Sequence, residues 1–207
     1  MKRALLGVAV VLGLALAGTN DAQAQGITLG VQGGYNLASL SSVPEDVSDV
    51  KDKGGLVLGA FVDIQFHDML FLGVEGNYTE HKSDVTDADG TSGFKQNYIQ
   101  IPAVLGVRLL KGLVQPVLYA GAAANFETSC NIDPETGDSQ DCSDVELDTK
   151  SSIWNAVFGG GVNVAVGPII VNGDIRYNLG LTKVSPDEDT KWNNWMFLVG
   201  AGLRLGS

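Results

Sequence analysis

The sequence predicts an all-β protein whose fold is an eight-stranded antiparallel up-and-down transmembrane β-barrel. Eight segments alternate apolar and polar residues with a period of two, the pattern of a strand with one apolar face. The connections between these segments are short and long in turn. Charged residues inside the segments share the face opposite to the apolar one. The chain's 27 glycines, many of them inside apolar segments, further disfavour helices.

The first four predicted strands have a clear alternation. Residues 27–39 read ITLGVQGGYNLAS, in which Ile, Leu, Val, Gly, Tyr and Leu alternate with Thr, Gly, Gln, Gly and Asn. Residues 55–66, 70–79 and 98–109 repeat the pattern, with hydrocarbon side chains on one face and mainly Gly, amide and charged residues on the other. Successive side chains of a strand point to opposite faces, so each segment presents one apolar side.

The last four predicted strands are residues 115–126, 153–165, 169–182 and 194–205. The first of these, QPVLYAGAAANF, leaves its register open because its Ala and Gly residues fit either face. The other three alternate clearly. An even number of strands is what a closed bacterial membrane barrel requires.

The connections predict which end of the barrel faces which side of the membrane. Three are tight, at residues 67–69, 111–114 and 166–168. Four are longer and polar: residues 39–54, 80–94, 127–152 and 183–193. Outer-membrane barrels have short periplasmic turns and longer extracellular loops. Neither an internal repeat nor a linker interrupts the pattern, which indicates one barrel domain.

Six charged residues within the strands all fall on the face that carries Gly and amides. They are Asp63, Glu75, Arg108, Asp174, Arg176 and Arg204. An Arg that faces lipid at the midplane of a barrel costs about 2–4 kcal/mol, so these charges should face the lumen and the apolar faces should contact lipid. The interior of an eight-stranded barrel is just wide enough for side chains to fill it. We therefore expect a filled polar lumen with a structural ion network, in which the pairing of acids and Arg residues is open.

Outward aromatic residues are expected to collect at one level. With strands running alternately up and down from a periplasmic N-terminus, Tyr35, Tyr78, Trp154, Tyr177 and Trp195 lie near the long-loop end. Phe126 joins them in one register of the fifth strand. This predicts an aromatic girdle at the boundary between lipid and water.

The N-terminus has the order of a secretory signal peptide. Lys2 and Arg3 precede an apolar run over residues 4–17, and small residues follow at Ala22-Gln23-Ala24. The alternative, a transmembrane helix, is disfavoured because the run is shorter than the roughly 20 residues that a bilayer requires. We expect residues 1–24 to be a signal peptide and residues 25–207 to form the exported barrel domain.

Two segments resemble recurrent segments of the PorT-like outer-membrane β-barrel family, which is related in architecture to OmpX- and OmpA-type barrels. They are Tyr98-Ile99-Gln100-Ile101-Pro102 and Asp174-Ile175-Arg176-Tyr177-Asn178-Leu179-Gly180-Leu181, and the stretch Phe158-Gly159-Gly160-Gly161-Val162 is similar too. The resemblance implies a protein of the bacterial outer membrane, often labelled porin-like. It also implies outer-membrane lipid as the surrounding partner, and we expect a monomer.

The charge of the chain bears on its partners. The net charge of −11 argues against nucleic acid or anionic lipid as the main partner. The four long connections contain 19 acids and six Lys, which predicts acidic extracellular loops. Such loops are either a solvated surface or a site for divalent cations or extracellular ligands. Residues 87–90 and 133–138 are candidates, although neither has the full ligand spacing of an EF-hand loop.

These features predict a structural or surface-binding role. The alternatives are a narrow porin for small solutes and a helper in envelope secretion or assembly. An enzyme is less expected: His67 lies in a short turn, and His81 lies at the outer end of the third strand without a nucleophile motif. We expect no catalytic residue, cofactor or dedicated metal site.

Two cysteines, Cys130 and Cys142, lie in the longest outer connection. In an exported protein, the expected use is a disulfide. Two free thiols or a metal-binding pair are the alternatives.

Overall fold

The computed structural model describes residues 26–40, 49–87, 90–133, 140–141, 152–182 and 191–206. Within these residues the chain forms nine strands. They are β1 (Gly26–Leu40), β2 (Asp49–Gln65), β3 (Leu70–Asp87), β4 (Gly90–Arg108), β5 (Val114–Asp133), β6 (Gln140–Asp141), β7 (Ser152–Val166), β8 (Ile169–Gly180) and β9 (Trp192–Leu205). No helix among the described residues is long and apolar enough to cross a membrane.

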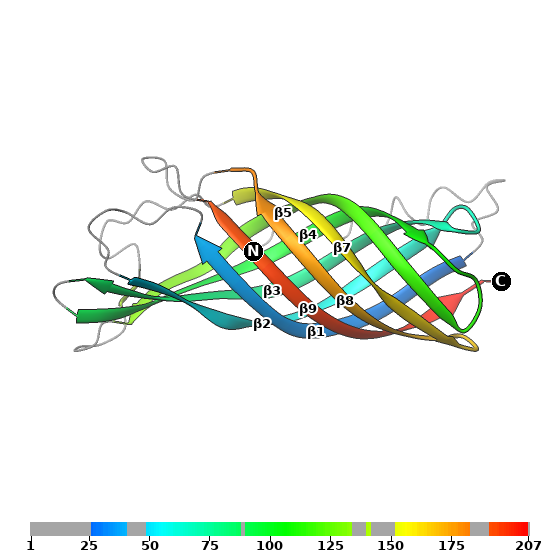
Figure 1. The fold of residues 1–207 in the computed structure, drawn as a ribbon, viewed down its shortest axis with the longest axis horizontal. Helices are drawn as coiled ribbons and strands as arrows, with labels where there is room; N and C mark the ends of the chain where they lie inside the picture. The colour runs from blue at the N-terminus through cyan, green and yellow to red at the C-terminus, as the bar shows by residue number, and fades with distance from the viewer. Residues whose placement is uncertain are drawn as a thin grey trace.

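Eight of the strands close into a barrel (Figure 1). Hydrogen-bonded neighbours follow the order β4-β3-β2-β1-β9-β8-β7-β5, and β5 pairs back with β4. All these pairs are antiparallel, and the first and last strands of the chain, β1 and β9, meet along the seam. The two-residue β6 adds to the outer end of β5 through Asn131 and Ile132. The predicted eight-stranded antiparallel barrel is confirmed.

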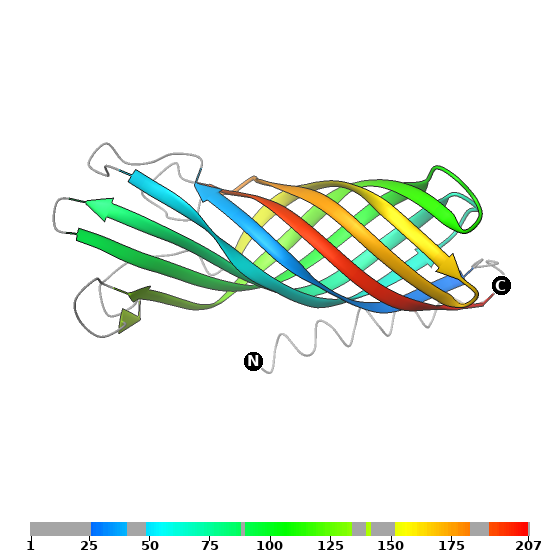
Figure 2. The same ribbon diagram turned by 60° about the horizontal axis from the view of Figure 1, so that its bottom comes forward.

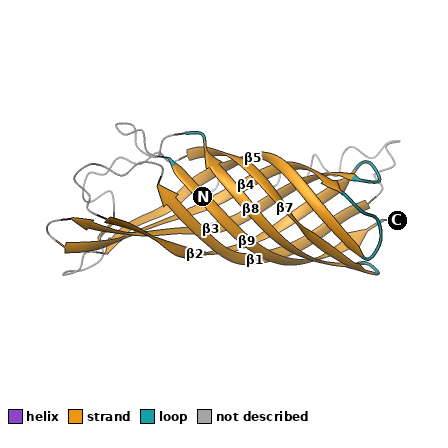
Figure 3. Ribbon diagram, in the orientation of Figure 1, coloured by secondary structure: helices purple, strands orange, loops and turns teal. Residues whose placement is uncertain are grey.

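The two ends of the barrel differ in their connections. Short turns at residues 66–69, 109–113 and 167–168 join β2 to β3, β4 to β5 and β7 to β8, as predicted (Figure 3). Gly167, with a φ of +60°, allows the two-residue turn between β7 and β8. The start of β1 and the end of β9 lie at this same end (Figure 1).

The strands at the opposite end are longer than the sequence analysis predicted. The expected loops at residues 39–54, 80–94 and 127–152 are in part strand, because β2 begins at Asp49, β3 continues to Asp87, β4 begins at Gly90 and β5 continues to Asp133. Figure 2 shows these four strands projecting as a sheet beyond the ends of β1, β7, β8 and β9. The outer parts of these strands have no continuous apolar face, so hydrophobic alternation did not reveal them. The outer sheet is the name used below for the projecting parts of β2, β3, β4 and β5, which are residues 49–54, 80–87, 90–97 and 127–133.

Irregular pairing marks the start of the outer sheet. The β2–β3 register shifts between Lys53 and Val57, and the β4–β5 register shifts between Asn97 and Tyr98. Such bulges bend and twist a strand locally. Gly55 is required at the first bulge, since a Cβ there would lie 1.8 Å from the backbone oxygen of Glu80.

The barrel is apolar outside and polar inside. Val31 and Val199 are 66% and 69% exposed on the outer surface, whereas the amide of Gln32 faces inward with 6% exposure. The open register of the fifth strand is now assigned: Asn125 is buried inside, and Phe126 is exposed outside. This arrangement suits a barrel that is surrounded by lipid.

Candidate functional site

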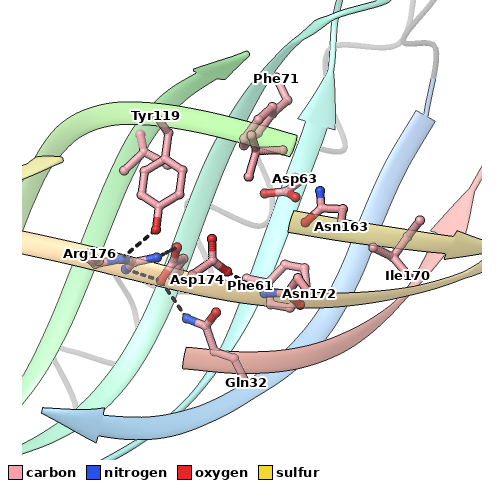
Figure 4. Close-up of a pocket in the computed structure, with 13 residues that line it drawn as sticks. Gln32, Phe61, Asp63, Phe71, Tyr119, Asn163, Ile170, Asn172, Asp174 and Arg176 are labelled. Atoms are coloured by element: carbon pink, nitrogen blue, oxygen red, sulfur yellow. Dashed lines mark hydrogen bonds and ion pairs between the residues drawn. The ribbon is translucent and has the colours of Figure 1, made fainter. Parts of the chain in front are cut away.

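A buried ion pair crosses the lumen. Figure 4 labels its cation, Arg176, and marks its bonds with dashed lines. Arg176 of β8, 2% exposed, donates from Nη2 to Oε1 of Glu75 at 2.7 Å and from Nη1 to Oε2 at 2.8 Å. This two-pronged geometry is the strongest that a guanidinium and a carboxylate form. Glu75 belongs to β3, which is four positions from β8 around the eight-stranded ring in either direction. The pair therefore connects opposite walls of the barrel.

Neutral side chains complete the coordination of this pair. Glu75 accepts hydrogen bonds from Gln32 (2.7 Å) and Asn77 (2.9 Å). Nε of Arg176 donates to the Tyr119 hydroxyl at 3.2 Å, and the guanidinium carbon lies 5.3 Å from the centre of the Tyr119 ring. Buried charges are tolerated when their remaining hydrogen-bonding capacity is satisfied in this way. Gln32, Asn77 and Tyr119 were not among the predicted residues of the ion network. The two amides could have been found from the sequence because they lie on the same strand face as the charged residues.

The other predicted lumen charges occupy two levels. Asp63 and Asp174 line a small cavity of about 40 Å³ beside the ion pair, where Asp174 accepts a hydrogen bond from Asn172 at 2.7 Å. Arg108 and Arg204 lie farther toward the short-turn end, on β4 and β9. The structure thus brings Glu75 and Arg176 into direct contact and separates them from these two Arg residues.

Aromatic rings fill the lumen beside the ion pair because glycines leave room for them. A Cβ on Gly159 would lie 2.4 Å from Cζ of Tyr119. Gly106 and Gly30 accommodate Phe71 and Phe61 in the same way, with a Cβ 2.2 Å and 2.4 Å from the respective Cζ atoms. Since a Cβ contact under 3 Å forces a shift, these close approaches depend on glycine.

A layer of buried amides closes the lumen above the ion pair, toward the outer sheet. Its members are Asn36, Gln100, Asn125, Asn155, Asn178 and Asn194, each no more than 4% exposed. Asn194 donates to Asn36 at 2.7 Å, and Nδ2 of Asn125 donates to Asn155 at 2.6 Å. Gln100 donates to Asn125 at 2.8 Å. Amides supply both donors and acceptors, so these pairs form without adding charge. Asn178 instead donates to Sδ of Met196 at 3.3 Å.

The base of the outer sheet contains a second charged cluster. Glu80 accepts from Lys82 (2.7 Å) and Lys95 (3.1 Å), and the Lys82 hydrogen bond lowers the pKa of Glu80 to about 2. His81, considered above as a conceivable catalytic residue, is buried, and its ring centre lies 5.2 Å from that of Tyr98. Burial lowers the pKa of His81 to about 4, which keeps the imidazole neutral at pH 7.

The residues of the predicted aromatic girdle all lie on the outer surface. Tyr35, Trp154 and Trp195 are about half exposed, at 49%, 52% and 50%. Tyr78 and Tyr177 are intermediate in exposure, and the rings of Tyr177 and Trp195 pack with centres 4.9 Å apart. Their contact with the boundary of the bilayer remains a prediction.

Several other predicted features involve residues outside the described part of the chain. Cys130 is buried at the outer end of β5, but Cys142 lies outside the described residues, so the disulfide remains a prediction. The proposed signal peptide at residues 1–24, most of the candidate cation segment at 133–138 and Asp89 are also outside them. Among the described residues, no group of three His, Cys, Asp or Glu side chains is placed to hold a metal ion.

Comparison with known proteins identifies the family. The family model described as the outer membrane protein beta-barrel domain matches residues 22–185. The chain belongs to this family of outer-membrane β-barrel proteins. This confirms the resemblance to small outer-membrane barrels, and it places the protein in the bacterial outer membrane. No curated protein matches the chain.

Solved structures of other small outer-membrane barrels share the fold. Neisserial surface protein A is 18% identical with a TM-score of 0.57, and the match covers 86% of this chain and 97% of that one. The outer membrane protein OprG of Pseudomonas aeruginosa is 14% identical with a TM-score of 0.59, covering 87% and 96%. The N-terminal barrel domain of OprF from the same organism is 14% identical with a TM-score of 0.51, covering 87% and 98%. At these identities the likeness concerns the fold alone.

Proposed function

We propose that this outer-membrane barrel is a closed, non-conducting and non-enzymatic protein that binds an extracellular partner through its outer sheet. The observation that carries the proposal is the outer sheet itself. β3 continues from Tyr78, at the level of the outward aromatics, to Asp87, which corresponds to a projection of roughly 20 Å for a tilted strand. A barrel whose role ended at the membrane would not need four strands that extend beyond it.

The filled lumen supports a binding role over a porin role. The Arg176–Glu75 pair joins opposite walls, and the amide layer lies above it. The cavity beside the pair measures only about 40 Å³, room for about three water molecules. A narrow porin would require these side chains to move aside together.

The charge of the outer connections supports a cationic partner. Residues 39–54, 80–94, 127–152 and 183–193 together contain 19 acids and six Lys. A surface of one dominant sign attracts ligands of the opposite sign and repels others. We therefore propose a positively charged ligand, and we propose that the protein binds it as a monomer.

A shortened hairpin tests this proposal. Lys82 and Lys95 are directly opposite each other on β3 and β4, so residues 83–94 can be replaced by an Asn-Gly turn without changing the register of the barrel. Binding of a fluorescent oligolysine peptide to the folded protein in a zwitterionic detergent provides the readout. We expect the shortened variant to remain a heat-modifiable barrel and to bind the peptide at least tenfold more weakly than the wild type.

A control of equal charge separates the outer sheet from a general charge effect. Residues 83–94 contain three acids, Asp84, Asp87 and Asp89, and residues 184–189 between β8 and β9 also contain three. Replacement of residues 184–189 by Gly and Ser removes the same charge from another connection. Equal losses in both variants, or no loss in the shortened hairpin, would contradict a binding role of the outer sheet.

A further inference from the structure

A second cavity opens at the short-turn end of the barrel. Its volume is about 270 Å³, and it shares no lining residue with the small cavity beside Arg176. The polar side chains that line it are Gln65, Asp68, Arg108, Lys111, Gln115 and Arg204. Because short turns of outer-membrane barrels face the periplasm, this cavity forms the periplasmic mouth of the lumen.

Positive charge dominates the periplasmic mouth. Arg108, Lys111 and Arg204 line it, and Asp68 is the acid among its lining residues. Asp68 is already engaged, because it accepts from Nζ of Lys111 at 2.5 Å. Arg108 and Arg204 carry like charges and line the same cavity, so they repel each other electrostatically. An anion between the two guanidinium groups would relieve this repulsion.

Both guanidinium groups retain hydrogen-bonding capacity. Arg108 is 4% exposed, and its Nη1 donates to Gln65 at 2.8 Å, whereas its Nε has no hydrogen-bond partner among the described residues. Within the same residues, Arg204 forms no ion pair. A buried guanidinium group with an unpartnered N–H is costly, and a negative charge in the adjacent cavity would offset part of that cost electrostatically.

We propose that the periplasmic mouth binds a phosphate group. Guanidinium groups hold phosphate oxygens through pairs of parallel N–H···O bonds, and an ammonium group adds a point charge. The three cations Arg108, Lys111 and Arg204 outnumber the one acid, Asp68, so the lining complements the negative charge of a phosphate monoester or diester. The group could belong to a soluble periplasmic phosphate compound or to the headgroup of a phospholipid in the inner leaflet, since both present the same oxygens.

Calorimetric titration of the folded full chain in a phosphate-free alkyl glucoside detergent tests this proposal. Inorganic phosphate and dihexanoyl phosphatidylglycerol are titrated separately, to distinguish a soluble source from a lipid source. R204Q should weaken binding at least tenfold, because it removes one of the two guanidinium groups. K191Q removes a Lys that directly precedes β9 at the opposite end of the barrel, outside the outer sheet; it is the matched control and should leave the affinity unchanged.

A variant that is expected to bind more tightly distinguishes loss of the phosphate site from loss of the folded structure. D68N releases Lys111 from its ion pair and removes the competing negative charge, so it should tighten binding several-fold. Binding of either titrant that weakens in R204Q and strengthens in D68N supports the site and identifies its source. The proposal is overturned if neither titrant binds, if R204Q binds as well as the wild type, or if K191Q weakens binding equally.

Discussion

Arg176 shows how a charged side chain is accommodated inside a barrel that is surrounded by lipid. Each of the three nitrogens of its guanidinium group donates a hydrogen bond, two to Glu75 and one to Tyr119. Desolvation of two charges opposes such a pair, and the attraction offsets it only when the geometry is good and the other lone pairs are satisfied. Gln32 and Asn77 meet that second condition for Glu75. Removal of one partner should therefore be worse than removal of both.

This residue-level claim predicts a specific order of stabilities. R176M leaves the Glu75 carboxylate buried without its cation, so the free energy of unfolding should fall by about 3–5 kcal/mol. The double variant R176M/E75Q should recover much of this loss. Urea or guanidinium titration in detergent, followed by tryptophan fluorescence, measures both. A double variant that is less stable than R176M would show that the two residues do not act as a pair.

The glycines beneath the lumen aromatics give a second residue-level prediction. G159A places a Cβ against the Tyr119 ring and should destabilise the barrel by about 1–3 kcal/mol, the usual cost of overpacking. Gly173, on neighbouring β8, has no atom within 4 Å of its Cβ position, so G173A is the matched control and should be tolerated. The combination G159A/Y119A should relieve the clash. Equal stability of G159A and G173A in the same titration would refute the close approach.

At the scale of elements, the strands within the membrane and the outer sheet follow different rules. A strand between lipid and lumen must alternate apolar and polar residues, so such strands are predictable from the sequence. The three short turns that connect them are predictable for the same reason, because the alternation stops there. The outer sheet follows no such rule: Asp84 of β3 and Gly93 of β4 are paired, although both lie in the segment that was interpreted as loop. Hydrogen bonding between the strands defines this sheet, and such pairing is not visible in the composition of either strand.

His81, at the base of the outer sheet, predicts how this element responds to pH. It lies three residues beyond Tyr78, outside the expected membrane-spanning segment. Burial lowers its pKa from 6.5 to about 4 in the folded protein. The unfolded chain therefore binds more protons between these values, and the free energy of unfolding should decrease as pH falls from 6.5 to 4, by about 3 kcal/mol.

The measurement compares variants, because carboxylates also titrate in this range. Denaturant midpoints at pH 7 and pH 4 should show a smaller acid destabilisation in H81F than in the wild type. H67Q, which alters the exposed His of a short turn, should behave as the wild type. Equal acid sensitivity of H81F and the wild type would contradict a neutral, buried His81.

At the scale of the whole molecule, the barrel reverses the usual arrangement of a water-soluble protein. Apolar residues such as Val199 and Leu105, 69% and 57% exposed, cover its outside, and ion pairs and amides fill its inside. Charge placement made this reversal predictable, since Arg on the lipid face is costly. The partnership of Glu75 with Arg176 was not predictable, because the residues are 101 positions apart and meet only after the closed ring places β3 opposite β8. The inward orientation of Tyr119 was not predictable for another reason. The Ala and Gly residues of its strand fit either face, so the sequence did not show which side chains point into the lumen.

Ion conductance of the purified, folded protein in a planar lipid bilayer tests the closed lumen most directly. An ion pair between opposite walls, beneath a layer of hydrogen-bonded amides, should leave no continuous path for hydrated ions. We therefore predict that inserted barrels give no steady channel. Stable, uniform conductance steps from the same heat-modifiable material would contradict the account and favour a porin.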